Sequence, residues 1–393
     1  MFALSTVARK TASLLIVAAA MLLSSCDDSA MTGATFGQRI NPGKPIEVGL
    51  LLPASDFDGG GAILAESAEN AARLAVADLQ DVEIDLRVYD TGGTPEGASA
   101  AATRAIAEGA KILLGPVFSQ TTLAAAGPAS SADVNILSLS NNEAIAGGRI
   151  FLLGSTFGNT ADRLVAFALR QGKRNVFVMH GNSLAEGQAR DAVANAVFSH
   201  DATLVGSGSF DLSQEGVTAA LPVLASQAKA AAADIVFLTS GNEGALPFLA
   251  DLLPEQGLGP DVVQYAGMRR LDIPTSALSV RGLQGSWFTL PDTALDQAFV
   301  ERYRATYGNQ PHPIVAAPAY DGIAAIGALA ARGDANALTS TGLTRSSGFV
   351  GASGVFRLFA DGTNQRGLAV AQVQDGKVVV IDPAPRSFSG SGF

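Results

Sequence analysis

Polar side chains follow two apolar runs in the first third of the chain, where they could capture a small solute. The run that ends at Leu114 leads through a turn into Ser119, which opens an alanine-rich helical stretch. A helix start offers free backbone N–H groups and the positive end of the helix dipole, and both suit a carboxylate. Hydroxyl and amide side chains donate and accept hydrogen bonds, as a polar or zwitterionic solute requires. The predicted ligand contacts from these runs are Ser119, Gln120, Ser140, Asn141 and Asn142.

Two further candidates, Asn242 and Arg269, follow apolar runs in the second half of the chain. An arginine can clamp a carboxylate through two parallel hydrogen bonds. Each candidate also has a purely structural interpretation: Ser119 as a helix N-cap, residues 140–142 as a polar turn, and Arg269 as a solvated surface side chain. The residues alone leave these alternatives open.

Patterns typical of catalytic sites are missing from the sequence. There is no glycine-rich phosphate loop ending in Gly-Lys-Ser/Thr and no His-Glu-x-x-His pair. The run Gly206–Ser209 lacks the spacing of a nucleophile elbow. Because His180, His200 and His312 are widely separated and Cys26 is the only cysteine, no transition-metal site is predicted. We therefore expect a protein that is not an enzyme and needs no cofactor.

The elements that must position these residues alternate regularly between strands and helices. Apolar runs rich in Val, Ile and Leu predict buried parallel strands, and the alanine-rich stretches between them predict covering helices. Two such series in one chain indicate an α/β fold with two doubly wound lobes. The first series has predicted strands at 46–52, 84–89, 111–114, 134–137 and 150–153, with helices at 62–80, 95–108 and 119–131. The second has strands at 176–180, 203–209, 235–239 and 262–266, with helices at 159–171, 184–199, 217–230 and 242–253.

The last third of the chain does not repeat the pattern, so we expect it to return and complete both lobes. Strands are predicted at 283–290, 354–359, 367–374 and 377–381, and helices at 293–307 and 314–332. Asp375-Gly376 predicts a two-residue hairpin turn between the last two strands. The expected division is 46–155 with about 290–345 in lobe 1, and 156–285 with about 350–383 in lobe 2. A cleft between the lobes would then hold the solute.

The start of the chain predicts export and lipid anchoring. Arg9 and Lys10 precede an apolar run, Leu14–Leu23, that is too short for a membrane-spanning helix, which needs about 20 residues. The run Leu23–Cys26 resembles the lipobox of bacterial lipoproteins, which implies cleavage of a signal peptide over 1–25 and acylation of Cys26. Residues 26–44 then form a flexible tether. Asp27-Asp28 resembles a retention signal for the inner membrane, although an outer-membrane location stays open.

Charge excludes one class of partner. Removal of Arg9 and Lys10 with residues 1–25 takes the formal net charge from −10 to −12. An acidic chain without a basic cluster is poorly suited to nucleic acid, so we predict no nucleic-acid partner.

The order of several runs resembles type I periplasmic solute-binding proteins, most closely their leucine/isoleucine/valine-binding branch. The resemblance covers residues 46–383 and implies that an amino-acid carboxylate binds at Ser119. Two departures stand out: position 184 is Leu where this branch commonly has Tyr, and Arg269-Arg270 stands where it commonly has a carboxylate for the ligand's ammonium. The matching runs are Ile46–Pro53, Tyr89-Asp90, Gly115–Ser119, Ile136–Ser140, Ala319–Gly322 with the candidate Tyr320, Val355–Gly362 and Gln372–Lys377.

Two functions follow from this resemblance. The first is a lipid-anchored extracytoplasmic binding protein that captures an amino acid or amino-acid-like solute for an ABC-type permease. The second is a lipoprotein similar to penicillin-binding protein activators, which regulates a peptidoglycan synthase by protein–protein contact. In the first, either Asp272 or Glu243 replaces the missing ammonium partner, or the ligand is not a standard amino acid.

Overall fold

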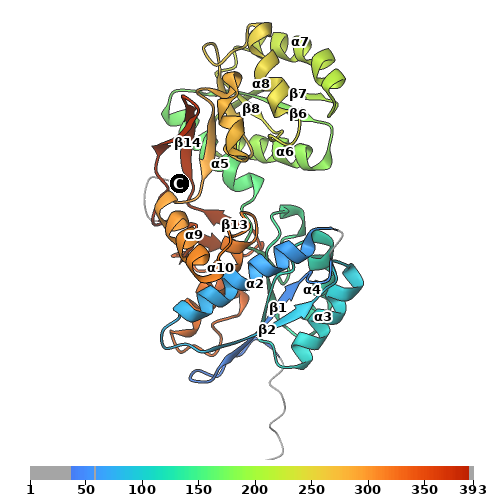
Figure 1. The fold of residues 1–393 in the computed structure, drawn as a ribbon, viewed down its shortest axis with the longest axis vertical. Coiled ribbons are helices and arrows are strands. Elements are labelled where there is room, and N and C mark those ends of the chain that lie inside the picture. Colours follow the sequence, from blue (N-terminus) through green and yellow to red (C-terminus); the bar gives the residue numbers. More distant parts are fainter. Residues whose placement is uncertain (1–36, 57–58, 389–393) are drawn as a thin grey trace, which may run out of the picture. The chain divides into compact units, whose positions relative to one another are not determined.

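The computed structural model describes residues 37–56 and 59–388 of the chain, and Figure 1 shows their fold as a ribbon. The predicted signal peptide, Cys26 and Asp27-Asp28 lie outside the described residues. The end of the predicted tether lies inside them and is packed, because Gln38 and Ile40 are buried. The Ile40 N–H donates to the carbonyl of Ala335 at 2.9 Å. The tether prediction is therefore wrong for this end of the segment.

The first sheet is parallel and has the strand order β2-β1-β3-β4-β5 among the described residues. Alternate side chains of one strand enter opposite layers: Leu50 and Leu52 pack toward α2 and α10, whereas Leu51 packs toward α3 and α4. Its strands are β1 (Ile46–Leu52), β2 (Ile84–Asp90), β3 (Ile112–Leu114), β4 (Asn135–Ser138) and β5 (Ile150–Leu152). The helices around it are α2 (Gly61–Asp78), α3 (Pro95–Ala107), α4 (Ser119–Ser131), α9 (Thr293–Tyr307) and α10 (Ala316–Ala330).

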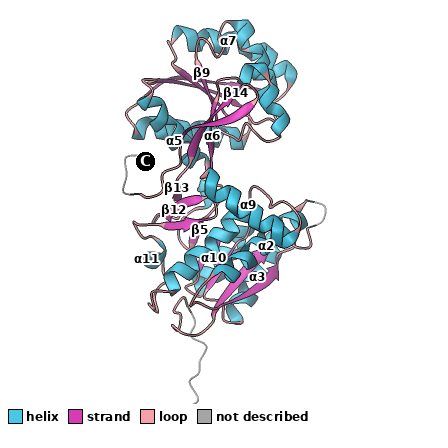
Figure 2. Ribbon diagram, turned by 60° about the vertical axis from the view of Figure 1, so that its left-hand side comes forward, coloured by secondary structure: helices cyan, strands magenta, loops and turns pink. Residues whose placement is uncertain are grey.

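The second sheet has the order β15-β14-β10-β9-β8-β6-β7, and helices again cover it on two faces (Figure 2). Five strands are parallel, and β14 and β15 add an antiparallel edge. The strands are β6 (Asn175–Gly181), β7 (Thr203–Phe210), β8 (Ile235–Leu238), β9 (Gln264–Gly267), β10 (Trp287–Leu290), β14 (Ala369–Gln374) and β15 (Lys377–Asp382). The helices are α5 (Phe157–Arg170), α6 (Leu184–Ser199), α7 (Gln214–Ala230) and α8 (Leu246–Leu252).

The C-terminal strands divide between the two sheets' cores. A small antiparallel sheet of β11 (Phe349–Gly351), β12 (Gly354–Leu358) and β13 (Asn364–Arg366) packs through Phe349 and Phe356 into the core of the first sheet. Only β14 and β15 join the second sheet, through the turn predicted at Asp375-Gly376, where both residues have positive φ. The prediction that about 350–383 all belongs to lobe 2 is therefore wrong for β11–β13. We call the first sheet with β11–β13 and its helices the first lobe, and the second sheet with α5–α8 the second lobe.

Several short elements differ from the predictions. The helix predicted at 242–253 begins only at Leu246, because Pro247 is tolerated in a first turn and disfavours helix before it. The strands β11 and β13 and the helix α11 (Ser340–Leu343) were not predicted. The same holds for the 3₁₀ turns η1 (Glu143–Ile145), η2 (Pro254–Gln256), η3 (Thr275–Ser279) and η4 (Arg281–Leu283). Within the described ranges, no helix has the length and apolarity to cross a membrane.

Candidate functional site

Three predicted ligand residues meet at the carboxyl edge of the first sheet. The hydroxyl of Ser119, the first residue of α4, lies 3.3 Å from the hydroxyl of Ser140. Asn142 donates from its amide to the Ser119 hydroxyl at 3.1 Å and from its backbone to the Ser140 hydroxyl at 3.2 Å. We call Ser119, Ser140 and Asn142 the serine–asparagine network. It places two hydroxyls and one amide beside the start of a helix.

The turn before α4 passes very close to strand β1. Gly115 has φ +84°, and a Cβ at this position would lie 2.3 Å from the carbonyl oxygen of Leu51. Only glycine therefore allows the loop to approach β1 this closely. The N-cap of α4 is Phe118, and no side chain caps this helix. The N-cap interpretation of Ser119 is thus wrong, because its hydroxyl bonds Ser140 and Asn142 instead.

The other candidates of the first lobe lie outside this network. Gln120 and Asn141 are exposed at the same edge. Tyr320 is elsewhere: its hydroxyl donates to Asp78 at the end of α2 at 2.6 Å, and the Arg302 guanidinium lies over its ring. Tyr320 lies inside α10 and packs against α2 and α9, so the structure does not bring it to the predicted site.

Asp90 joins the ends of the first two strands at the same edge. Its carboxylate accepts from the backbone N–H groups of Ser55 at 3.2 Å and Gly92 at 2.9 Å. Burial raises the pKa of Asp90, but hydrogen bonds from Ser55, Gly92 and Ala54 outweigh it and leave this pKa below its usual value. The loops after β1 and β2 are thereby held together.

The carboxyl edge of the second sheet is organised by Glu186, which the sequence analysis missed. This buried carboxylate accepts from the N–H of Gly181, from the Thr239 hydroxyl at 2.8 Å and from the Ser240 hydroxyl at 2.7 Å. It therefore links the ends of β6 and β8. Glu186 follows Ser183 by three residues, a spacing typical of a capping box, which was the available signal.

Asn242 and Arg269 both lie at this second edge. Asn242 donates from its amide to the carbonyls of Leu271 at 3.1 Å and Ile273 at 2.9 Å, and so holds the loop after β9. Arg269 lies with its guanidinium carbon 5.4 Å from the centre of the Phe157 ring, and its Nη1 is 3.5 Å from Glu243 Oε1. Asn242 is thus a loop-holding residue, whereas Arg269 presents a cation at the edge.

A hydrogen bond joins the two edges. Gln188, in the second turn of α6, donates to the side-chain oxygen of Asn142 at 3.2 Å. This places the second lobe's α6 against the serine–asparagine network. Nothing in the sequence singled out Gln188, because pairing between residues 46 positions apart leaves no local pattern.

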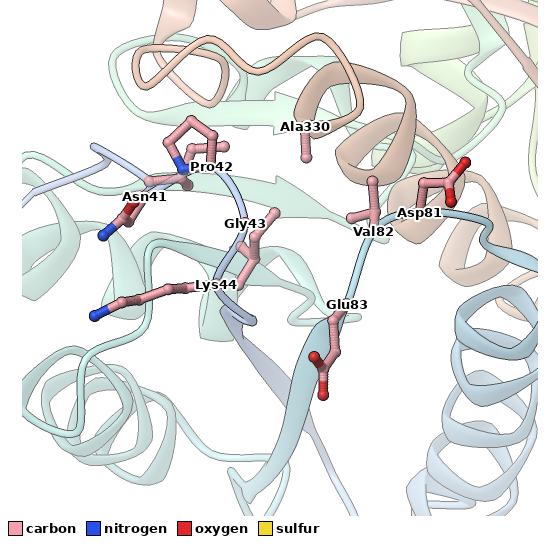
Figure 3. A pocket seen from close by; sticks show the side chains of 10 residues that line it. Asn41, Pro42, Gly43, Lys44, Asp81, Val82, Glu83 and Ala330 are labelled. Atoms are coloured by element: carbon pink, nitrogen blue, oxygen red, sulfur yellow. The ribbon is translucent and has the colours of Figure 1, made fainter.

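Two pockets are lined by other residues of the described chain. The first, of 360 Å³, lies where β1 and β2 begin, the end opposite Ser119, and Figure 3 shows Asn41, Lys44, Asp81 and Glu83 around it. The second, of 460 Å³, lies between α5, α6 and residues 359–366. Neither is lined by a predicted ligand residue. Among the described residues, no group of three or more His, Cys, Asp or Glu could hold a metal ion.

Comparison with known proteins identifies the class. A family model described as periplasmic binding protein matches residues 45–377. The two-lobed α/β architecture with parallel sheets is the type I periplasmic-binding-protein-like fold. Because the match spans most of the chain, this protein belongs to the periplasmic binding protein family.

Solved structures show the same fold at low sequence identity. A branched-chain amino acid ABC transporter periplasmic ligand-binding protein from Burkholderia xenovorans LB400 has a TM-score of 0.65 at 18% identity, covering 88% of this chain and 97% of that one. A substrate-binding protein from Desulfitobacterium hafniense in complex with Leu has a TM-score of 0.61 at 19% identity, and the match covers 86% of this chain and 100% of that one. A solute-binding protein from R. palustris in complex with benzoate has a TM-score of 0.57 at 20% identity, and the match covers 89% of this chain and 99% of that one.

One curated relative, an uncharacterized protein of Rickettsia prowazekii (RP748), is 29% identical over 111 residues. The match spans 28% of this chain and 29% of that protein's length.

Proposed function

We propose that this protein is a non-enzymatic extracytoplasmic receptor that captures a small polar solute, an amino acid or a related organic acid, between its lobes and delivers it to an ABC permease. The observation that supports this most is the serine–asparagine network at the carboxyl edge of the first sheet. Two hydroxyls and the uncapped start of α4 give this edge donors for a carboxylate. Neighbours with this fold bind leucine or benzoate, and both carry a carboxylate.

Gln188 supports a site that uses both lobes. Its amide reaches Asn142 from α6, so side chains of the second lobe approach the donors of the first. Closure of two lobes on a solute is a hinge motion stabilised by contacts that only the closed form makes. A solute with a carboxylate at one end would then meet Ser119 and Ser140 on one side and residues of the second lobe on the other.

Lipid anchoring through Cys26 is part of the proposal and depends on the run Leu23–Cys26. We expect anchoring to the inner membrane, with Asp27-Asp28 as the reason. Metabolic labelling with a fatty-acid analogue tests the anchor, with Cys26→Ala as the control. Equal labelling of the two proteins would exclude acylation at this residue.

A thermal-shift screen tests solute capture. Purified protein is heated with amino acids, short organic acids, benzoates and muropeptides. A solute at 100 times its Kd stabilises the fold by about 2.7 kcal/mol, which corresponds to about 3–5 °C in Tm for a chain of this size. A dose-dependent shift with at least one solute is expected. If no solute shifts Tm and the protein instead captures a peptidoglycan synthase in a pull-down, the second candidate replaces the first.

That second candidate, regulation of a peptidoglycan synthase by protein contact, has one observation in its favour. Leu184 opens α6 at the second edge and is 81% exposed, which suits a protein surface better than a polar-solute site.

A further inference from the structure

The loop after β9 places two arginines at the edge of the second lobe. The Arg269 side chain is 36% exposed and lies over the face of Phe157. Its Nη1 makes only a 3.5 Å contact to Glu243, and its Nε is buried without a hydrogen-bond partner among the described residues. Arg269 therefore keeps donor capacity for an acceptor that this lobe does not supply.

Asp272 and Glu243 at this edge lie beside the same two arginines, whereas the buried Glu186 accepts from one backbone N–H and two hydroxyls. Arg270 donates to both oxygens of Asp272, at 2.6 Å each, in the fork geometry that makes arginine–carboxylate pairs strong. The Asp272 side chain is only 17% exposed. An ammonium group could use Asp272 only after displacing Arg270, and Glu243 only beside Arg269.

One more carboxylate, Asp296 in the first turn of α9, is close enough to this loop to interact with it. Burial raises the pKa of Asp296, Arg270 lowers it, and Asp272 and Asp321 raise it further. A ligand ammonium group bound at Asp296 would thus lie near the positively charged Arg270 guanidinium. Like charges in a partly desolvated site repel each other strongly, because solvent screens them poorly.

We propose that the site selects an organic acid that lacks an ammonium group, such as a 2-oxo acid or an aromatic acid. The inference rests on the proposed function and narrows its solute class. The serine–asparagine network would donate to the carboxylate from the first lobe, and Arg269 would donate from the second lobe to the same carboxylate or to the adjacent 2-oxo oxygen. An amino acid of the same skeleton brings its positive charge to an edge where Asp272 and Glu243 lie beside arginines and Glu186 is already bonded to one backbone N–H and two hydroxyls.

Isothermal titration calorimetry with matched pairs of solutes tests this. Leucine is compared with 4-methyl-2-oxopentanoate, and phenylalanine with phenylpyruvate and benzoate, so that each pair differs chiefly in the ammonium group. We expect at least one acid without ammonium to bind at least tenfold more tightly than its amino-acid partner. An amino acid that binds as tightly as, or more tightly than, its partner overturns this inference and leaves the proposed function standing. If none of these binds and no solute shifts Tm in the screen, the proposed function itself fails.

Single substitutions test which residues select against the ammonium group. Arg269→Gln is expected to weaken the preferred acid at least tenfold, while Arg281→Gln, an exposed arginine in η4, is the matched control and is expected to leave its Kd unchanged. Equal Kd values for Arg269→Gln and the unmodified protein would contradict a role for Arg269. Loss of leucine binding in Asp272→Asn would identify Asp272 as an ammonium partner and overturn the inference. Circular dichroism melts show whether each variant is folded. The comparison of solute pairs uses the unmodified protein and so does not depend on the variants.

Discussion

Individual polar residues at the two sheet edges divide into those that present donors and those that hold loops. Ser183 caps α6 by accepting from the N–H of Glu186 at 3.3 Å, as the spacing predicts. The Glu186 carboxylate, however, turns to Gly181, Thr239 and Ser240 instead of completing a capping box. Buried oxygens need partners, and three donors at the strand ends satisfy them better than one N–H would. Glu186 is thus a positioning residue for the second edge.

Ser119 is the residue on which solute capture depends most. Ser119→Ala removes a hydroxyl donor and leaves the Asn142 amide without its acceptor. We expect affinity for a carboxylate solute to fall by about 1–2 kcal/mol, the scale of a hydrogen bond to a charged group. Calorimetry with the best solute of the screen measures it.

Ser131→Ala is the control for this prediction. Ser131 ends the same helix, and its hydroxyl donates to the carbonyl of Gly127 at 3.1 Å in an exposed position. Its Kd is expected to match that of the unmodified protein. A Ser119→Ala protein with the same Kd would place the carboxylate elsewhere.

At the scale of elements, α9 carries a titratable group into the crossing between the lobes. Burial raises the pKa of Asp296 above its ordinary value of 3.8. The folded protein therefore keeps this proton over a pH range in which the unfolded chain has lost it, so the contribution of Asp296 to stability falls as pH rises through that range.

Asp296→Asn removes the ionisation and should remove this decline. We expect the stability of the variant relative to the unmodified protein to increase from pH 4 to pH 7. Urea unfolding at pH 4, 5, 6 and 7 gives the two free-energy profiles. Glu301→Gln, an exposed carboxylate on the same helix, is the control. Parallel profiles for Asp296→Asn and the unmodified protein would contradict burial as the cause.

At the scale of the whole molecule, the described chain crosses between the lobes after β5, after β10 and after β13. After β15 it returns to the first lobe, where Arg357 of β12 lies over the Phe388 ring. Buried polar side chains of β13 hold the segment that follows β5. Arg366 donates to the carbonyl of Leu153 at 3.0 Å and to Asp321 at 2.8 Å. Asn364 donates to the carbonyls of Leu152 and Gly154, both at 2.9 Å. The crossing after β5 is therefore held by residues of the first lobe.

Asp321→Ala tests this bracing. The Asp321 and Arg366 side chains are 0% and 5% exposed, so the variant leaves a buried guanidinium without its counter-charge. We expect the free energy of unfolding to fall by about 3–5 kcal/mol, measured by chemical denaturation.

The exposed pair Arg73–Glu69 on α2 provides the comparison, and Glu69→Ala is expected to cost less than about 1 kcal/mol. Similar losses for both variants would mean that the Asp321–Arg366 pair contributes no more than a surface ion pair.

Much of the architecture was predictable from local pattern. The limits of β1, α4, α6 and α9 match the predicted ranges, because continuous apolar runs and helix-starting residues act within a few positions. The segments 349–351 and 364–366 were missed, because three residues carry no period and pair only through long-range contacts. The serine–asparagine network could be predicted as residues at neighbouring strand ends, whereas its hydrogen bonds could not.

The sequence by itself determined the alternation of strands and helices, hence two doubly wound lobes, and it placed polar residues at strand ends. Apolar periodicity and turn chemistry are local, so a single chain records them. Only the tertiary structure decided that β11–β13 pack with the first lobe, that Tyr320 bonds Asp78, that Asp272 is paired with Arg270, and that Gln188 reaches Asn142. Each of these depends on which buried or charged partner a side chain meets in space, and sequence separation does not encode that choice.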